Sequence, residues 1–144
     1  MTSAIDVQKV LSRRKFELLP SKPGATTKTA VKWVSLRDFD SFVAGYLRTV
    51  GTAALTSLTI QAADDNSGTN AVDIKVKDVT ANPDAVDDYV FVEVSAAEVE
   101  GIAPGKEYVA LVVEESNAAN EAVALYDLDR AHFPQADLTA DYIQ

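Results

Sequence analysis

Apolar and polar side chains alternate along the middle of the chain with the two-residue period of a β-strand. The alternation is clearest over residues 72–77, where three β-branched residues share one face and three charged residues share the other. Residues 58–62 and 121–128 show the same period. Residues 89–94 and 108–113 are apolar on nearly both faces, which predicts central strands. These runs together predict a β-rich domain.

The segments between the runs are rich in residues that form turns. Residues 64–70 read Asp-Asp-Asn-Ser-Gly-Thr-Asn and residues 81–84 read Ala-Asn-Pro-Asp, and both compositions are typical of loops. Residues 116–120 predict the turn of a hairpin between the strands that flank them. Short strands at this spacing predict an all-β fold, a two-sheet β-sandwich of jelly-roll or immunoglobulin-like type.

One short helix is expected within this series of strands. Ser95 is a favoured helix-capping residue, and Glu98 stands at the reciprocal position of a capping box. Gly101 and the pair Pro104-Gly105 end the helix after one or two turns.

The pattern over residues 35–50 fits two structures. Its apolar residues form the stripe of an amphipathic helix, and Ser35 with Asp38 can cap that helix. The alternation over residues 42–47 fits a strand equally well. The period alone does not decide between the two. The apolar residues concerned are Leu36, Phe39, Phe42, Val43, Tyr46 and Leu47.

Residues 1–32 lack a sustained period and contain Pro20, Pro23 and Gly24, which favour extended or turning backbone. We interpret this piece as an extended N-terminal arm, in which the run 16–19 can add one strand, and residues 33–144 as the sandwich. A disordered terminus is the alternative interpretation.

Charge separates close to the same boundary. Residues 1–37 carry eight Lys or Arg and two acidic residues, a net charge of +6, while the remainder carries five basic and twenty acidic residues, a net charge of −15. The total is −9. A basic arm on an acidic body predicts that the arm binds a protein surface, with a solvated run of charge as the alternative. The expected partner-binding residues combine charge with apolar anchors: Arg13, Arg14, Lys15, Phe16, Leu18 and Leu19.

Composition argues against several classes of function. The chain has no cysteine and one histidine, which removes thiol chemistry and leaves little for a histidine-based metal site. The acidic body repels nucleic acid and anionic lipid, and no run of apolar residues is long enough to cross a membrane. The first ten residues lack the apolar core of a signal peptide, so we expect synthesis in a cytoplasm. No catalytic residue, cofactor or metal is expected.

Residues 64–70 offer the hard oxygen ligands with which a calcium loop begins. An EF-hand that starts at Asp64 needs a glutamate at the position of Lys75. We favour a solvated turn, with calcium binding as the alternative.

Two further groups have candidate chemistry. Asp84, Asp87 and Asp88 can perform acid–base work in a closed pocket, but in a proline turn they are expected to cap backbone. His132 follows Asp127 and can titrate near neutral pH, yet the chain has no nucleophile-elbow motif. The aromatic residues fall mostly at alternating strand positions, which predicts core packing.

The segment Trp33-Val34-Ser35-Leu36-Arg37-Asp38-Phe39, followed by an apolar run to Gly51, resembles small structural proteins of tailed bacteriophages. Gln61-Ala62 before the Ser-Gly-Thr-Asn of residues 67–70 is similar too, as are the runs 108–113 and 122–126. The resemblance covers residues 33–133 through short motifs. It implies that residues 42–50 form a strand.

The same resemblance implies a virion structural protein made in the host cytoplasm. Its expected role is a capsid decoration (cement) protein, or else a head–tail connector or tail component. The expected partners are the major capsid protein or another virion protein, together with copies of itself. Two rival functions stay open: an extracellular carbohydrate-binding or adhesin-like sandwich, and a small hydrolase with a carboxylate pair.

Overall fold

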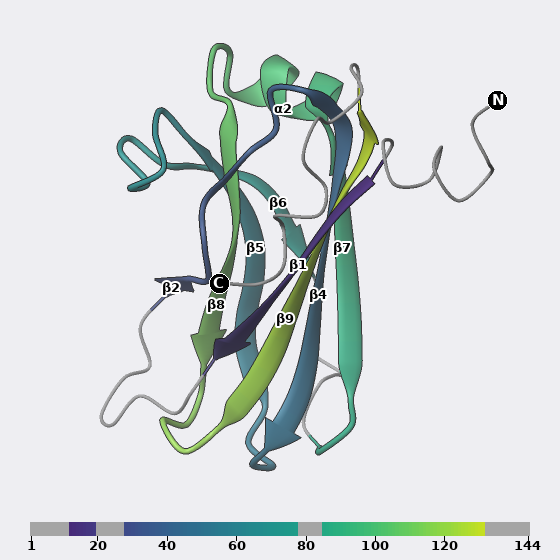
Figure 1. Cartoon of the computed structure of the whole chain (residues 1–144). Coiled ribbons are helices and arrows are strands. Elements are labelled where there is room, and N and C mark those ends of the chain that lie inside the picture. The colour runs from purple at the N-terminus through teal and green to yellow at the C-terminus, as the bar shows by residue number, and fades with distance from the viewer. Residues whose placement is uncertain (1–11, 20–27, 78–84, 132–144) are drawn as a thin grey trace, which may run out of the picture.

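The fold is a two-layer β-sandwich closed at one end by a short helix (Figure 1). The computed structural model describes residues 12–19, 28–77 and 85–131, with backbone alone for residues 12–19, 29, 130 and 131. The strands are β1 (Ser12–Leu19), β2 (Thr29–Ala30), β3 (Val34–Ser35), β4 (Phe39–Val50), β5 (Leu55–Ala63), β6 (Val72–Lys77), β7 (Tyr89–Ser95), β8 (Tyr108–Glu115) and β9 (Glu121–Ala131), and the helix is α2 (Ala96–Ile102).

Sheet A has the strand order β1-β9-β4-β7, and sheet B has the order β2-β8-β5-β6 with β3 also paired to β8. Every pairing is antiparallel. The pairs are nested: β1 with β9, β2 and β3 with β8, β4 with β7, and β5 with β6. This is one long hairpin rolled into two sheets, the jelly-roll arrangement. The predicted two-sheet sandwich is confirmed, and the strand order selects the jelly roll over the immunoglobulin-like alternative.

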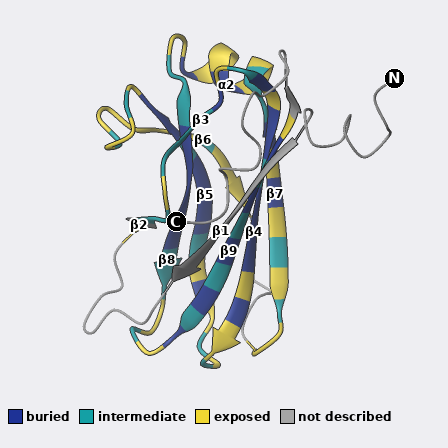
Figure 2. Cartoon of the chain, viewed as in Figure 1, coloured by how far each residue is buried: buried dark blue, intermediate teal, exposed yellow. Residues whose placement is uncertain are grey.

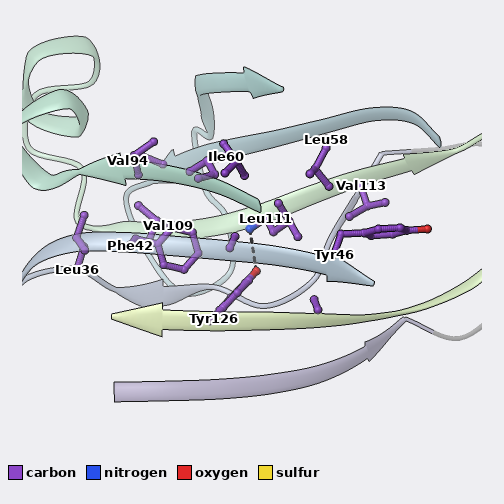
Figure 3. Close-up of a cluster of buried hydrophobic side chains, with 14 of the residues drawn as sticks. Leu36, Phe42, Tyr46, Leu58, Ile60, Val94, Val109, Leu111, Val113 and Tyr126 are labelled. Carbon is purple, nitrogen blue, oxygen red and sulfur yellow. Dashed lines mark hydrogen bonds between the residues drawn. The ribbon is translucent and has the colours of Figure 1, made fainter. Parts of the chain in front are cut away.

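The core lies between the two sheets, where alternate residues of β4, β5, β8 and β9 pack against one another (Figure 3). The rings of Phe42 and Tyr126 meet edge to face at 4.8 Å between centroids. The hydroxyl of Tyr126 also accepts a hydrogen bond of 2.7 Å from the backbone N–H of Leu111, which links the two sheets through the core. The position of one sheet relative to the other is therefore fixed by side-chain packing and by this hydrogen bond.

The ambiguous segment is a strand from Phe39 to Val50, which confirms the strand that the resemblance implied for residues 42–50. β4 pairs with β7 on one side and β9 on the other over most of its length. Backbone pairing on both sides satisfies the donors and acceptors that a helix would have satisfied internally, so sheet context overrides the helical stripe.

The predicted helix is confirmed together with its cap. The Ser95 hydroxyl accepts from the Glu98 backbone N–H at 3.1 Å, and the Glu98 carboxylate accepts from the Ser95 backbone N–H at 2.7 Å. Among the residues described, no helix is both long and apolar enough to traverse a bilayer.

The predicted hairpin at residues 116–120 is wrong. The strands on either side of it lie in different sheets, β8 in sheet B and β9 in sheet A. The segment is a connection between layers, because each of these strands finds its partners further away along the chain.

Candidate interaction surface

The outer side of sheet A carries large apolar side chains where β7 forms its edge. The exposed fractions are 68% for Tyr89, 49% for Phe91 and 39% for Leu47. Figure 2 shows the exposed stretches on β7, in contrast to the mostly buried β5 and β8. Scattered apolar residues are normal on a surface, but adjoining exposed aromatic residues make this face the candidate interaction surface.

Two sequence predictions are wrong at this strand. Residues 89–94 form an edge strand and not a central one, and the rings of Tyr89 and Phe91 lie outside the core. The inward positions of β7 are occupied by valines, so the aromatic rings fall on the opposite face. The two rings meet edge to face at 5.8 Å.

The strand register extends this surface across the sheet. Phe91 lies opposite Gly45 on β4, and Gly45 lies opposite Leu125 on β9. A Cβ atom at Gly45 would stand 2.5 Å from Cε1 of Phe91, so the ring fills the space that a side chain on β4 would occupy. The glycine is needed here for close packing of the ring.

A second row runs beside the first. Tyr89 lies opposite Leu47, which lies opposite the half-buried Val123. Directly opposed residues of antiparallel strands share a face, so the two rows form one surface. We call it the apolar face and define it by Leu47, Tyr89, Phe91, Val123 and Leu125, with Gly45 at its centre.

The six predicted partner-binding residues all lie on β1, whose backbone pairs with β9 along its whole length. Three of them stand opposite outward residues of β9: Arg14 opposite Asp127, Phe16 opposite Leu125, and Leu18 opposite Val123. The other three, Arg13, Lys15 and Leu19, stand opposite the inward residues Leu128, Tyr126 and Ala122. Both β1 and β2 fall within the predicted arm, whose residues 1–11 and 20–27 lie outside the described residues. Partner binding by the six residues stays a prediction.

The carboxylates of the candidate calcium loop accept hydrogen bonds from the loop itself and from Lys106. Both carboxylate oxygens of Asp65 accept hydrogen bonds from within the loop, from the Ser67 and Thr69 backbone and the Thr69 hydroxyl. Asp64 accepts from Lys106 at 2.5 Å and from Asn70 at 2.7 Å. These hydrogen bonds hold the pKa of both carboxyl groups below the ordinary value. Among the described residues, no cluster of three or more His, Cys, Asp or Glu has an arrangement suited to a metal ion.

The second acidic group supports the backbone. The carboxylate of Asp88 accepts from the Ala85 backbone N–H at 3.0 Å, and the backbone of Asp87 and Asp88 pairs with that of Arg48. Asp84 and His132 lie outside the described residues.

A buried polar network closes the end of the sandwich opposite α2, and the sequence analysis missed it. Arg48 is fully buried, and its guanidinium donates to the Tyr46 hydroxyl at 2.7 Å, the Ala53 carbonyl at 2.7 Å and the Glu115 carboxylate at 3.0 Å. The Tyr46 hydroxyl donates to Glu115, and Asn120 donates to the Glu115 carboxylate and the Ala53 carbonyl. Arg48 stands at an inward position of the alternation along β4. That alternation is the sequence signal from which its burial could have been predicted.

The groups of this network pair with one another and hold parts of the fold together. Burial, with the Glu115 carboxylate beside it, raises the pKa of the Tyr46 hydroxyl above its ordinary value. Each charged group faces a partner inside the protein, and the network joins β4 to the connections before β5 and after β8.

The fold and this surface define a jelly-roll protein with an open apolar face. No protein-family model matches the chain, and no curated protein matches it. One solved structure that it is similar to is the SPBc2 prophage-derived protein YomS, at 13% sequence identity, with a TM-score of 0.38 over 81% of this chain and 95% of that one. A TM-score of this size transfers neither fold nor function.

Proposed function

We propose that this protein is a structural component of a tailed-bacteriophage particle, a capsid decoration (cement) protein that binds the shell through protein–protein contacts. The observation that carries the proposal is the apolar face, because large exposed aromatic and aliphatic side chains in adjoining rows indicate a protein-binding surface. The sequence resemblance over residues 33–133 supplies the phage context.

The jelly-roll topology is compatible with this role without selecting it. Viral capsid proteins, lectins and cupins all use this architecture, so the surface and not the fold must carry the function. In the proposal the chain acts by binding, and neither a cofactor nor a catalytic group takes part.

Binding to many equivalent sites on a symmetric shell explains how a small binding face can hold the protein on the particle. A decoration protein meets the same site many times on a symmetric shell, so modest single contacts add up over the particle. In this proposal Arg14 of β1, at an outward register position, supplies charge for contact with acidic neighbours, and the apolar face supplies buried area.

The test uses particles of the phage whose genome encodes the chain. Mass spectrometry of the purified particles is expected to find the protein in many copies, and the added protein is expected to sediment with particles that lack it. Phe91→Ser should abolish co-sedimentation, whereas Val76→Ser should not, because Val76 is 64% exposed on β6 of sheet B and is not part of the apolar face. Absence of the protein from the particles would overturn the proposal.

A second candidate, carbohydrate binding, is favoured by the exposure of Tyr89 and Phe91. Their ring planes are inclined at 64°, so the two rings do not form one flat platform for a sugar. Binding to a glycan array that Tyr89→Ser removes would establish this function in place of the first.

A further inference from the structure

The backbone of β7 bonds to β4 at alternate residues only, and this alternation determines which residues face the open edge of the strand. The Arg48 N–H donates to the Asp88 carbonyl at 2.9 Å, so the even-numbered residues that follow along β7 also face β4. The odd-numbered residues face the other way. In agreement with this, Lys75 Nζ on β6 donates to the Glu93 carbonyl at 2.8 Å, and the Ser95 N–H donates into the capping box of α2.

The open part of this edge is the backbone of Tyr89 and Phe91. Within the described ranges, no hydrogen bond reaches the backbone of either residue from the side away from β4. Further along the strand, the Lys75 ammonium covers the Glu93 carbonyl and lies 3.6 Å from the Glu98 carboxylate. The backbone donors and acceptors that stay open therefore lie beside the two exposed rings of the apolar face.

β6, the edge strand of sheet B, is protected against pairing in a way that β7 is not. Its Lys75 and Lys77 stand opposite the buried core residues Ile60 and Leu58, so both lysines lie at inward positions. Inward-pointing charges on an edge strand keep further strands from adding to it. The inward positions of β7 are occupied by valines instead. The edge of β7 therefore stays available for a strand along its open part.

A partner that covers the apolar face also has to satisfy this part of the backbone. Burial of the Tyr89 and Phe91 rings removes water from the N–H and C=O groups of the same residues. A buried backbone group without a partner costs about as much free energy as a lost hydrogen bond. An extended segment pairs such groups in their own alternation, as in the addition of a strand to a sheet edge. The edge therefore favours a partner that offers extended backbone.

Charge indicates what kind of segment fits this edge. Asp87 before the open part and Glu93 after it are both exposed, and Glu98 lies beyond Glu93. Antiparallel pairing with β7 of a second copy, centred on Phe91, would bring Asp87 of each copy toward Glu93 and Glu98 of the other. Like charges brought together suppress such a contact, whereas a segment with basic flanks is attracted. The acidic ends of the edge therefore select a basic segment over a second copy.

We propose that an extended segment of the shell protein adds to the open edge of β7 as a further strand of sheet A. The segment carries apolar side chains that lie beside Tyr89 and Phe91, with Lys or Arg at its flanks, beside Asp87 and Glu93. The inference rests on the proposed function and deepens it by naming the part of the shell that binds. The added strand extends the apolar face and leaves that face open to the rest of the shell.

Amide hydrogen exchange of the whole chain, measured by NMR, tests the added strand directly. The probe is the acetylated and amidated peptide Lys-Thr-Val-Thr-Val-Thr-Lys, which places valines between basic flanks on one face of a strand. In the free protein the amides of Val90, Val92 and Val94 should exchange slowly and those of Tyr89 and Phe91 fast. Saturating peptide should slow the Phe91 amide by at least about tenfold and leave the valine amides unchanged.

The direction of the backbone bonds is tested on the peptide itself. One version is methylated on the valine nitrogens and another on the threonine nitrogens. Only one of the two sets faces β7 in an added strand, so one version should bind and the other should not. Equal effects of the two methylations would contradict strand addition.

Substitutions at Glu93 test the same bonds from the side of the protein. Glu93→Ala removes the charge and keeps the outward N–H, whereas Glu93→Pro removes both. Proline is tolerated on an edge strand where its nitrogen faces outward. Glu93→Pro should bind the peptide about tenfold more weakly than Glu93→Ala, because a carbonyl of the peptide loses its donor. Circular dichroism checks that each variant is folded, and the methylated peptides give the comparison without any substitution.

Lys75 competes with the added strand for the Glu93 carbonyl, so its removal should improve binding. Lys75→Met should tighten the dissociation constant for the peptide by about twofold to fivefold. Lys77→Met is the matched control, since it makes the same change of charge on β6. An equal gain in both variants would show that charge alone is responsible and would contradict the competition.

The inference is overturned if the peptide does not bind, or if it binds without slowing exchange of the Phe91 amide. A Phe91 amide that is already protected in a wild-type dimer would show that a second copy occupies the edge, which also contradicts it. The proposed function fails separately. Protein found on phage particles with no peptide binding at β7 would refute strand addition alone, and peptide binding at β7 with protein absent from particles would refute the particle role alone.

Discussion

Replacing Glu115 by glutamine tests whether the buried Arg48 network holds the end of the sandwich together. The change keeps the shape of the side chain but removes the negative charge that faces the Arg48 guanidinium. It also places the two N–H donors of a glutamine amide where, in the wild type, the Glu115 carboxylate accepts from Tyr46, Arg48 and Asn120. A fully buried cation would lose its counter-charge, and some of these donors would face another donor.

The expected loss of folding stability follows from the burial of the Arg48–Glu115 ion pair. Removing one partner of a buried ion pair costs about 3–5 kcal/mol. The Glu115 side chain is 18% exposed, so water can reach part of the site, and we expect about 3 kcal/mol, the lower end of that range. Such a loss corresponds to a fall of roughly 6–12 °C in melting temperature for a chain of this size.

Urea denaturation followed by circular dichroism measures the change directly. With a urea m-value of about 2 kcal/mol/M, the midpoint should fall by about 1.5 M. Arg48→Met in the Glu115→Gln background should cost less than it does alone, because the lone charge is then absent. A Glu115→Gln variant within about 1 kcal/mol of the wild type would refute the reasoning, since it would mean that Arg48 does not depend on this carboxylate.

Three further predictions concern single sites. Gly45→Ala should lower the free energy of unfolding by about 1–2 kcal/mol, because the new methyl group displaces the Phe91 ring; the same change in a Phe91→Ala background should cost less, and an equal cost in both would contradict the contact. Ser95→Ala should cost about 1 kcal/mol through loss of the capping box, seen as a drop in melting temperature that Ser95→Thr largely avoids. The Tyr46 hydroxyl has a raised pKa, so the stability that it contributes is fully present below the unfolded-state value of 10.0 and is lost as pH rises above it. Unfolding measured from pH 9 upward should therefore show a steeper loss in the wild type than in Tyr46→Phe, and parallel curves would contradict the assignment.

Much of the secondary structure could be predicted from local pattern. The alternating runs became β5, β6 and β9, the continuous apolar run at 108–113 became β8, and Ser95 with Glu98 formed the expected capping box. These features depend on neighbours within a few residues, which a single sequence contains. The helix-or-strand choice at residues 39–50 depended on the strands on either side, which the sequence does not place next to one another.

The candidate surface was only partly predictable. The six residues Arg13, Arg14, Lys15, Phe16, Leu18 and Leu19 were selected by charge and composition, and the register now places Phe16 and Leu18 in line with the rows of the apolar face. Tyr89 and Phe91 were expected in the core, since an apolar run looks the same whether a strand is central or at an edge.

The sequence by itself determined that the chain forms β-strands, which faces of most of them are apolar, where helix α2 begins, and that a basic segment precedes an acidic body. Only the tertiary structure decided which strands share a sheet, that β7 lies at an edge with its aromatic rings outward, and that Arg48 is buried against Glu115. The reason is that alternation records the two faces of a strand, whereas burial depends on what packs against each face, and those partners lie far away along the chain.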